Sequence, residues 1–137
     1  MTPTQISLVK STFVLALPIS DEVASEFYRR LFKACPHVRR MFAEDMASQR
    51  QKLMLTLTAI VSDLDHLDRL VPLVGELARR HVAYGARVEH YAPVGDALIE
   101  TLRAALGPKF TPGVEDAWAA AYALLAGAMI QAVSQAA

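Results

Sequence analysis

LARRHVAYGARVEHY, residues 77–91, is the segment from which we interpret the rest of the chain. Apolar residues lead into it at steps of three and four, which places the imidazole of His81 on the inward face of one helix. They are Leu67, Leu70, Val71, Val74, Leu77 and Ala78. Gly85 predicts the end of this helix. Two interpretations of His81 are open at this point: a neutral imidazole that binds a metal or haem iron, or a core histidine bonded to a nearby carbonyl.

Length and composition indicate one domain that covers residues 1–137. The chain has 137 residues and 53% hydrophobic content, which is enough for a single core and too little for two. Lysine plus arginine and aspartate plus glutamate number 14 each, so no net charge attracts nucleic acid or anionic lipid. Cys35 is the single cysteine and cannot form an internal disulfide, which favours a reducing, cytoplasmic location.

Two apolar segments are weighed as export or membrane signals, and neither fits. Residues 13–19 form a short run that contains Pro18 and lacks a small-residue cleavage pattern, so a signal peptide is not expected. Nothing after Asp116 is charged, yet this tail is rich in alanine and carries Gln131. A helix buried on all sides therefore fits the tail better than a membrane span.

Periodicity and helix-boundary residues predict an all-α chain. Thr2, Pro3 and Gln5 form a capping-box start. Proline and glycine residues separate further segments with helical spacing, and no segment alternates with the period of two that is typical of a strand. The expected helices cover approximately residues 3–17, 20–35, 36–42, 47–63, 65–84, 93–106 and 111 onward.

Three polar side chains are expected to face the core from three different helices: Tyr28, Gln49 and His81. A buried polar group without a partner costs about 1 to 3 kcal/mol. These groups therefore bond to one another or to a ligand that lies between them. For each residue alone a simpler interpretation stays open, because a tyrosine often keeps its hydroxyl in water and a glutamine near a helix start is often solvated.

Four segments carry a resemblance to a known family. They are FYRRLFKACPHVRRMF at 27–42, QRQKLM at 49–54, RRHVAYGARVEHYAPVGDAL at 79–98 and AWAAAY at 117–122. In this order and spacing the chain resembles the globins, in particular the single-domain bacterial haemoglobins and the haem domain of flavohaemoglobins. The resemblance implies an all-α globin fold, a three-over-three helical sandwich around one haem b (iron protoporphyrin IX), with O2, NO and CO as gas ligands.

The resemblance also implies roles for individual residues. His81 matches the proximal iron ligand, and Phe42 matches the aromatic residue that stacks on the porphyrin. Tyr91, ten positions after His81, matches the proximal tyrosine of flavohaemoglobins, and Lys52 matches a position that often reaches a haem propionate. The residues that match the distal positions, which meet the bound gas, are Tyr28, Gln49 and Leu53.

Two departures from the family pattern affect these roles. Val133 stands where flavohaemoglobins have a glutamate that polarises the ligand histidine. His81 is therefore expected to be a less anionic ligand, better suited to holding oxygen than to cleaving its bond. Only residues 43–48 separate Phe42 from Gln49, a shorter connection than in most globins. Gln49 is then either displaced from the iron or carried on a mobile segment, and Tyr28 is expected to be the principal donor.

The resemblance implies two functions. The first is a cytoplasmic haem-binding globin that reversibly binds oxygen for storage, transport or scavenging. The second is a nitric oxide dioxygenase that uses a separate reductase, since the chain has no room for the flavin and nicotinamide modules of a flavohaemoglobin. A monomer or a weak homodimer is expected in either case. A haem-free helical interaction module, whose polar groups simply bond to one another, is the alternative from another class.

Overall fold

The computed structural model describes residues 1–136 and the side chains of residues 1–133, and every regular element within them is helical. The all-α prediction is confirmed. The α-helices are α1 (Pro3–Ala16), α2 (Ser20–Ala34), α3 (Ala47–Ser62), α4 (Leu67–Ala83), α5 (Tyr91–Leu106) and α6 (Pro112–Ala136). Short 3₁₀ helices join some of them: η1 (Leu17–Ile19), η2 (Pro36–Met41), η3 (Val88–His90) and η4 (Gly107–Lys109).

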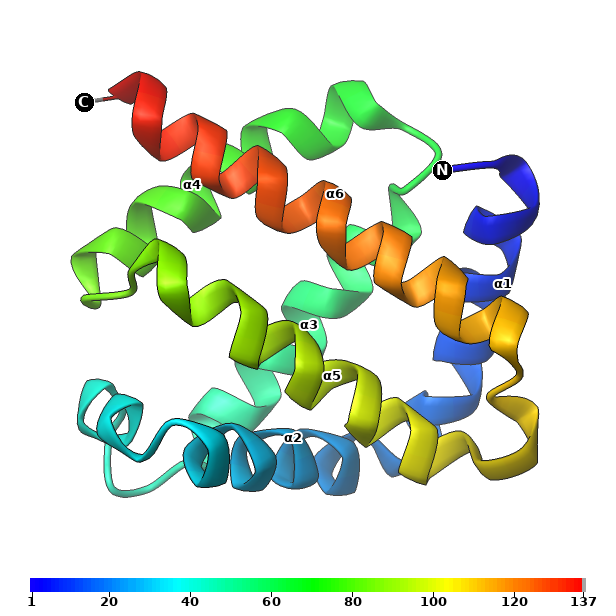
Figure 1. Cartoon of the computed structure of the whole chain (residues 1–137), viewed down its shortest axis with the longest axis horizontal. Helices are drawn as coiled ribbons and strands as arrows, with labels where there is room; N and C mark the ends of the chain where they lie inside the picture. Colours follow the sequence, from blue (N-terminus) through cyan, green and yellow to red (C-terminus); the bar gives the residue numbers. More distant parts are fainter. Residues whose placement is uncertain (137) are drawn as a thin grey trace.

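The helices pack as a sandwich around one internal space. The longest helix, α6, packs against α1, α4 and α5, while α2 packs against α3 and α5. Figure 1 shows α5 and α6 running side by side across the molecule, with α3 running crosswise to both. α4 starts near α1 and runs toward the opposite end of the molecule. Side chains from α2, α3, α4, α5 and α6 line the space that these helices enclose, and the site lies there.

Local signals set the helix boundaries largely as predicted. The hydroxyl of Thr2 accepts the backbone N–H of Gln5 at 3.1 Å, and the amide oxygen of Gln5 accepts the backbone N–H of Thr2 at 3.0 Å. Gly85 follows α4 with a φ of 94°, and Gly107 follows α5 with a φ of 56°. Glycine adopts these conformations without a steric penalty, which is why both helices end there. The predicted capping box and the predicted helix end at Gly85 are confirmed.

A buried polar contact joins α1 to α6 outside the lining of the cavity. The indole Nε1–H of Trp118 donates to the hydroxyl of Thr12 at 2.9 Å, and that hydroxyl donates to the carbonyl of Leu8 at 2.6 Å. Trp118 and Thr12 are both buried, so each polar atom has the partner that burial requires. The contact joins α1 to α6 across 106 positions of sequence.

The predicted all-round burial of α6 is wrong. Leu124 is 42% exposed, and Ala119, Ala123, Gly127 and Ala128 are also exposed. The reason is that α6 has helical neighbours along one side only, and small side chains on its outer face add little apolar surface. The stretch Pro112–Val133 is long and apolar enough to cross a membrane by length and composition, a test that core helices of folded domains also pass.

The apolar series of α4 is only partly buried. Leu70, Val74 and Ala78 are buried as predicted, but Leu67 and Val71 are 57% and 69% exposed. Neighbouring helices therefore cover only part of the apolar face that the sequence of α4 predicts. The two exposed side chains instead line a shallow groove between α4 and α6.

A glycine in α5 allows α6 to approach closely. A methyl group added at Gly95 would lie 2.6 Å from the ring of Tyr122, nearer than real side chains come. The Tyr122 hydroxyl donates to the backbone carbonyl of Tyr91 in the first turn of α5. Gly95 therefore fixes the spacing of the two helices at the wall of the site.

We expect Gly95→Ala to lower the free energy of unfolding by about 1 to 3 kcal/mol, because the added methyl group displaces the ring of Tyr122. Gly127→Ala is the matched control, since nothing lies within 4 Å of the added methyl group there. Alanine in place of an exposed helical glycine should raise stability by about 0.5 to 1 kcal/mol. Urea unfolding followed by circular dichroism measures both, and equal effects would contradict the packing role of Gly95.

Candidate haem and gas-binding site

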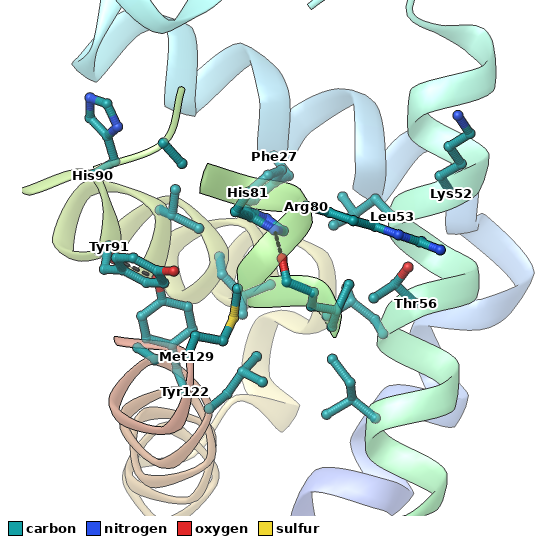
Figure 2. Close-up of a pocket in the computed structure, with 18 of the residues that line it drawn as sticks. Phe27, Lys52, Leu53, Thr56, Arg80, His81, His90, Tyr91, Tyr122 and Met129 are labelled. Atoms are coloured by element: carbon teal, nitrogen blue, oxygen red, sulfur yellow. Dashed lines mark hydrogen bonds between the residues drawn. The ribbon is translucent and has the colours of Figure 1, made fainter. Parts of the chain in front are cut away.

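One cavity of about 490 Å³ lies among five helices, and Figure 2 shows most of the side chains that line it. This volume is within the range of small-molecule sites, and most of its lining is apolar. The polar and ionisable side chains in the lining are Tyr28, Gln49, Lys52, Thr56, Arg80, His81, Tyr84, His90, Tyr91 and Tyr122. Six of the seven residues that the sequence singled out are therefore found around one space: Tyr28, Gln49, Lys52, Leu53, His81 and Tyr91.

His81 presents one ring nitrogen to this cavity. It lies in the last turn of α4, and its Nδ1 is 2.7 Å from the carbonyl oxygen of Leu77, so Nδ1 carries the proton and donates it. Nε2 then holds a lone pair. The side chain is exposed to the space that it lines, which does not fit a buried core histidine. A carbonyl partner on the outer nitrogen is the usual way in which proteins orient an imidazole that binds a metal.

Tyr28 and Gln49 meet on the α2 and α3 side of the cavity. The amide Nε2 of Gln49 donates to the phenol oxygen of Tyr28 at 3.0 Å. Tyr28 is buried, and burial raises the pKa of its phenol, an effect that the bond from Gln49 partly offsets. The phenol oxygen accepts from Gln49, so its own proton is left to donate elsewhere.

The short connection before α3 is held in place by Arg39. The guanidinium of Arg39 donates to the carbonyl oxygens of Ala43 at 2.9 Å and of Glu44 at 3.0 Å, and it also lies 5.2 Å from the ring centre of Phe32. These bonds fix residues 42–44. The sequence left open whether the short connection displaces Gln49, and in the structure Gln49 reaches Tyr28.

Phe42 is the one predicted site residue that does not line the cavity. Its ring packs edge-on against Tyr28 with centroids 5.5 Å apart, and against Phe32 at 5.4 Å. Phe42 therefore supports the tyrosine that lines the cavity. Its stacking on a porphyrin stays a prediction.

The α5 side of the cavity is apolar around Tyr91. Tyr91 and Val133 pack against the same small cluster, whose buried members are Val74, Ala78 and Met129. Burial raises the pKa of the Tyr91 phenol, with no charged group contributing to the shift. Val133, the departure from the family pattern in the sequence, therefore adds an apolar side chain and no charge beside Tyr91.

Sequence reasoning missed several polar side chains of the lining: Thr56, Arg80, Tyr84, His90 and Tyr122. Arg80 lies directly before His81 and forms an ion pair with Glu76. A helical pattern assigns Arg80 to the outer face of α4, where an arginine is usually solvated. Its long side chain nevertheless reaches across toward Thr56 and Lys52, as Figure 2 shows. Adjacency to His81 was the only signal that could have identified it.

The donor set fits a planar iron cofactor better than a bare metal ion. Among the described residues, no three His, Cys, Asp or Glu side chains come close enough to share an ion. A single imidazole needs further ligands, and a porphyrin supplies four of its own. The apolar lining fits a flat hydrocarbon ring system, while Lys52 and Arg80 are cations suited to its carboxylates. The lining therefore fits a haem group, with His81 as the candidate iron ligand and Tyr28 as the candidate hydroxyl donor.

Comparisons with known proteins agree. The family description "Globin" matches residues 25–129. Flavohemoproteins of Bordetella parapertussis and Vibrio cholerae are each 33% identical to this chain over 133 residues, 95% of its length. The chain spans about a third of these relatives, 33% and 34% of their lengths. A bacterial globin structure from Campylobacter jejuni superposes with a TM-score of 0.86 at 25% identity, covering 98% of this chain and 97% of that one.

The chain therefore belongs to the globin family. It is a haem-binding globin with the all-α globin fold, as the sequence indicated.

We expect His81→Gly to remove the normal haem absorption spectrum of the purified protein, because the only imidazole at the proximal position is lost. Imidazole added to the buffer should restore it in part, since the free ligand can enter the space left by the side chain. His66→Gly, at an exposed histidine before α4, is the control and should leave the spectrum as it is. An unchanged spectrum in His81→Gly would refute the assignment of the ligand.

Proposed function

We propose that this chain binds molecular oxygen reversibly on haem b, for storage, transport or scavenging in the cytoplasm, without a membrane span and as a monomer or weak homodimer. The observation that carries the proposal is the hydrogen bond from Gln49 to Tyr28 in the cavity that His81 also lines. That bond leaves a hydroxyl proton available on one side of the site, while the carbonyl of Leu77 leaves a nitrogen lone pair on the other.

His81 would hold the haem iron through Nε2, and the haem would supply the iron that binds a diatomic gas. The phenol of Tyr28 then donates a hydrogen bond to the gas in the distal space. Its raised pKa keeps it a neutral donor throughout the neutral pH range, because burial disfavours the phenolate. Gln49 orients that phenol and is a second amide donor within reach of the same space.

Apolar side chains keep this donor effective. Leu53, Leu57 and Phe27 line the cavity on the same side as Tyr28. They exclude water that would compete for the hydroxyl proton and that promotes oxidation of the iron. Leu53 also supplies bulk, which limits the room for a ligand. Lys52 and Arg80 would hold the haem propionates at the opening.

His81 is oriented as a neutral ligand. Its hydrogen-bond partner is the carbonyl of Leu77. A carbonyl is a weaker acceptor than a carboxylate and gives the imidazole less anionic character. Val133 brings no charge to the α5 side. These two features support oxygen binding over cleavage of the oxygen bond.

We expect Tyr28→Phe to speed oxygen release about tenfold, because one hydrogen bond of about 1 to 1.5 kcal/mol is lost. Carbon monoxide release should change far less, since carbon monoxide gains little from a donor. Gln49→Leu should have a smaller effect, because the Tyr28 hydroxyl remains. Tyr84→Phe, at an exposed tyrosine of the same lining, is the control. Stopped-flow measurement of gas release tests all three variants, and equal oxygen rates in wild type and Tyr28→Phe would overturn the proposal.

Nitric oxide dioxygenation is the second candidate, in which nitric oxide, oxygen and one electron give nitrate. The same donor pair would hold oxygen for this reaction, and the relatives at 33% identity are flavohemoproteins. A separate reductase would supply the electron. The apolar surroundings of Tyr91 favour the binding function.

Nitrate yield with a supplied flavin reductase separates the two candidates. If the chain is an oxygen binder, we expect about one nitrate per haem and then arrest, because the oxidised haem is re-reduced slowly. Sustained nitrate production over many turnovers, in proportion to added nitric oxide, would instead identify an enzyme.

A further inference from the structure

Two histidines to which the gas-binding proposal gives no role meet at the edge of the cavity. His37 comes from η2 and His90 from η3, and their Nε2 atoms lie 3.3 Å apart. The ring centres are 5.4 Å apart with the planes tilted by 44°. His90 also lines the cavity. This contact joins two elements that are 53 positions apart in the sequence.

The partners of His90 determine where the protons lie. Its Nδ1 accepts the backbone N–H of Arg87 at 2.9 Å, so Nδ1 carries a lone pair. In the neutral ring the proton must then be on Nε2, which donates it to His37. The Nε2 of His37 therefore carries a lone pair as well, and its proton is on Nδ1. Both hydrogen bonds exist together only when both rings are neutral.

The same assignment argues against a bound metal ion. A metal between the two rings would need a lone pair on the Nε2 of each. The bond from the Arg87 N–H to Nδ1 places the proton of neutral His90 on Nε2 instead. The pair is a hydrogen bond between neutral imidazoles.

Protonation breaks this arrangement at either ring. A proton added to His37 sets an N–H against the N–H of His90, and a proton added to His90 sets an N–H against that of Arg87. The charged side chains on these elements are mainly cationic, namely Arg39, Arg40 and Arg87, with Glu89 as the acid of η3. Their repulsion opposes a charged pair further. Histidine is the side chain that gains a proton in mild acid, and protonation of either ring removes one hydrogen bond of this arrangement.

We propose that the His37–His90 pair is a pH-sensitive latch that holds the segment from Gly85 to Tyr91 against η2. This segment supplies three lining residues of the cavity, Ala86, His90 and Tyr91, and Val94 follows one turn into α5. Gly85, with its φ of 94°, is a backbone position at which the segment can turn outward. Opening of the latch in mild acid loosens one wall of the cavity. The consequence for haem rests on the function proposed above, whereas the latch itself does not.

Nitrogen NMR of the imidazole rings tests the latch whether or not haem is present. At about pH 8 we expect His90 protonated only on Nε2 and His37 only on Nδ1, and as the pH falls the two rings should change protonation as a coupled pair. His37→Ala should leave His90 to titrate alone. His66, which is not part of the contact, is the internal control, and its ring signals should be the same in wild type and His37→Ala. A proton on Nδ1 of His90 at pH 8, or independent titration of the two rings, would overturn the proposal.

Haem transfer to an excess of apomyoglobin tests the consequence in the haem-loaded protein. Between about pH 7.5 and 5.5 we expect the rate in wild type to rise about fivefold more than in His37→Ala, the factor that corresponds to one hydrogen bond of ordinary strength. His37→Ala should lose haem faster at pH 7.5, because the contact with His90 is missing. His37→Gln, whose amide oxygen still accepts from His90, should lose haem slowly at pH 7.5. Its rate of haem loss should depend less on pH than that of wild type. Identical profiles for wild type and His37→Ala would refute the effect on haem.

Discussion

The hydrogen bond from Gln49 to Tyr28 is the contact on which the rest of the site depends. It joins α2 to α3 in the lining of the cavity and fixes which atom of the phenol is free. The bond forms because Arg39 holds the carbonyls of the short connection and because Phe42 and Phe32 support the tyrosine ring. The position of the Tyr28 hydroxyl in the apolar cavity therefore depends on Arg39 and on the rings of Phe32 and Phe42, none of which lines the cavity.

Much of the fold was predictable because its signals are local. The capping box at Thr2 and the positive φ at Gly85 and Gly107 follow from the chemistry of neighbouring residues. The residues around the cavity were predictable for a different reason. Helical spacing placed Tyr28, Gln49 and His81 inward from separate helices, and three polar groups in an apolar core have to meet one another or a ligand.

The features that the sequence did not predict depend on contacts between helices that are far apart in the chain, and no local sequence pattern encodes these contacts. Leu67 and Val71 continue the apolar stripe of α4 but are exposed, because α6 covers only part of that stripe. Phe42 follows η2 at the expected position, yet its ring turns toward Tyr28 rather than into the cavity lining. Arg39 could not be singled out among the neighbouring arginines, since its value lies in three-dimensional reach to the carbonyls of residues 42–44.

One physical rule connects the functional groups of this chain. The hydrogen bond that a side chain makes at one position decides whether it has a proton or a lone pair to use at another. The carbonyl of Leu77 accepts the Nδ1–H of His81, so Nε2 keeps a lone pair that is able to bind a metal. The amide of Gln49 donates to the Tyr28 oxygen, so the hydroxyl proton of Tyr28 can be donated to another group. The backbone N–H of Arg87 donates to Nδ1 of His90, so the proton of the neutral ring is on Nε2 and is donated to His37. A neighbouring backbone or amide group thus sets the chemistry of each ring, and the rings keep that chemistry only while those partners stay in place.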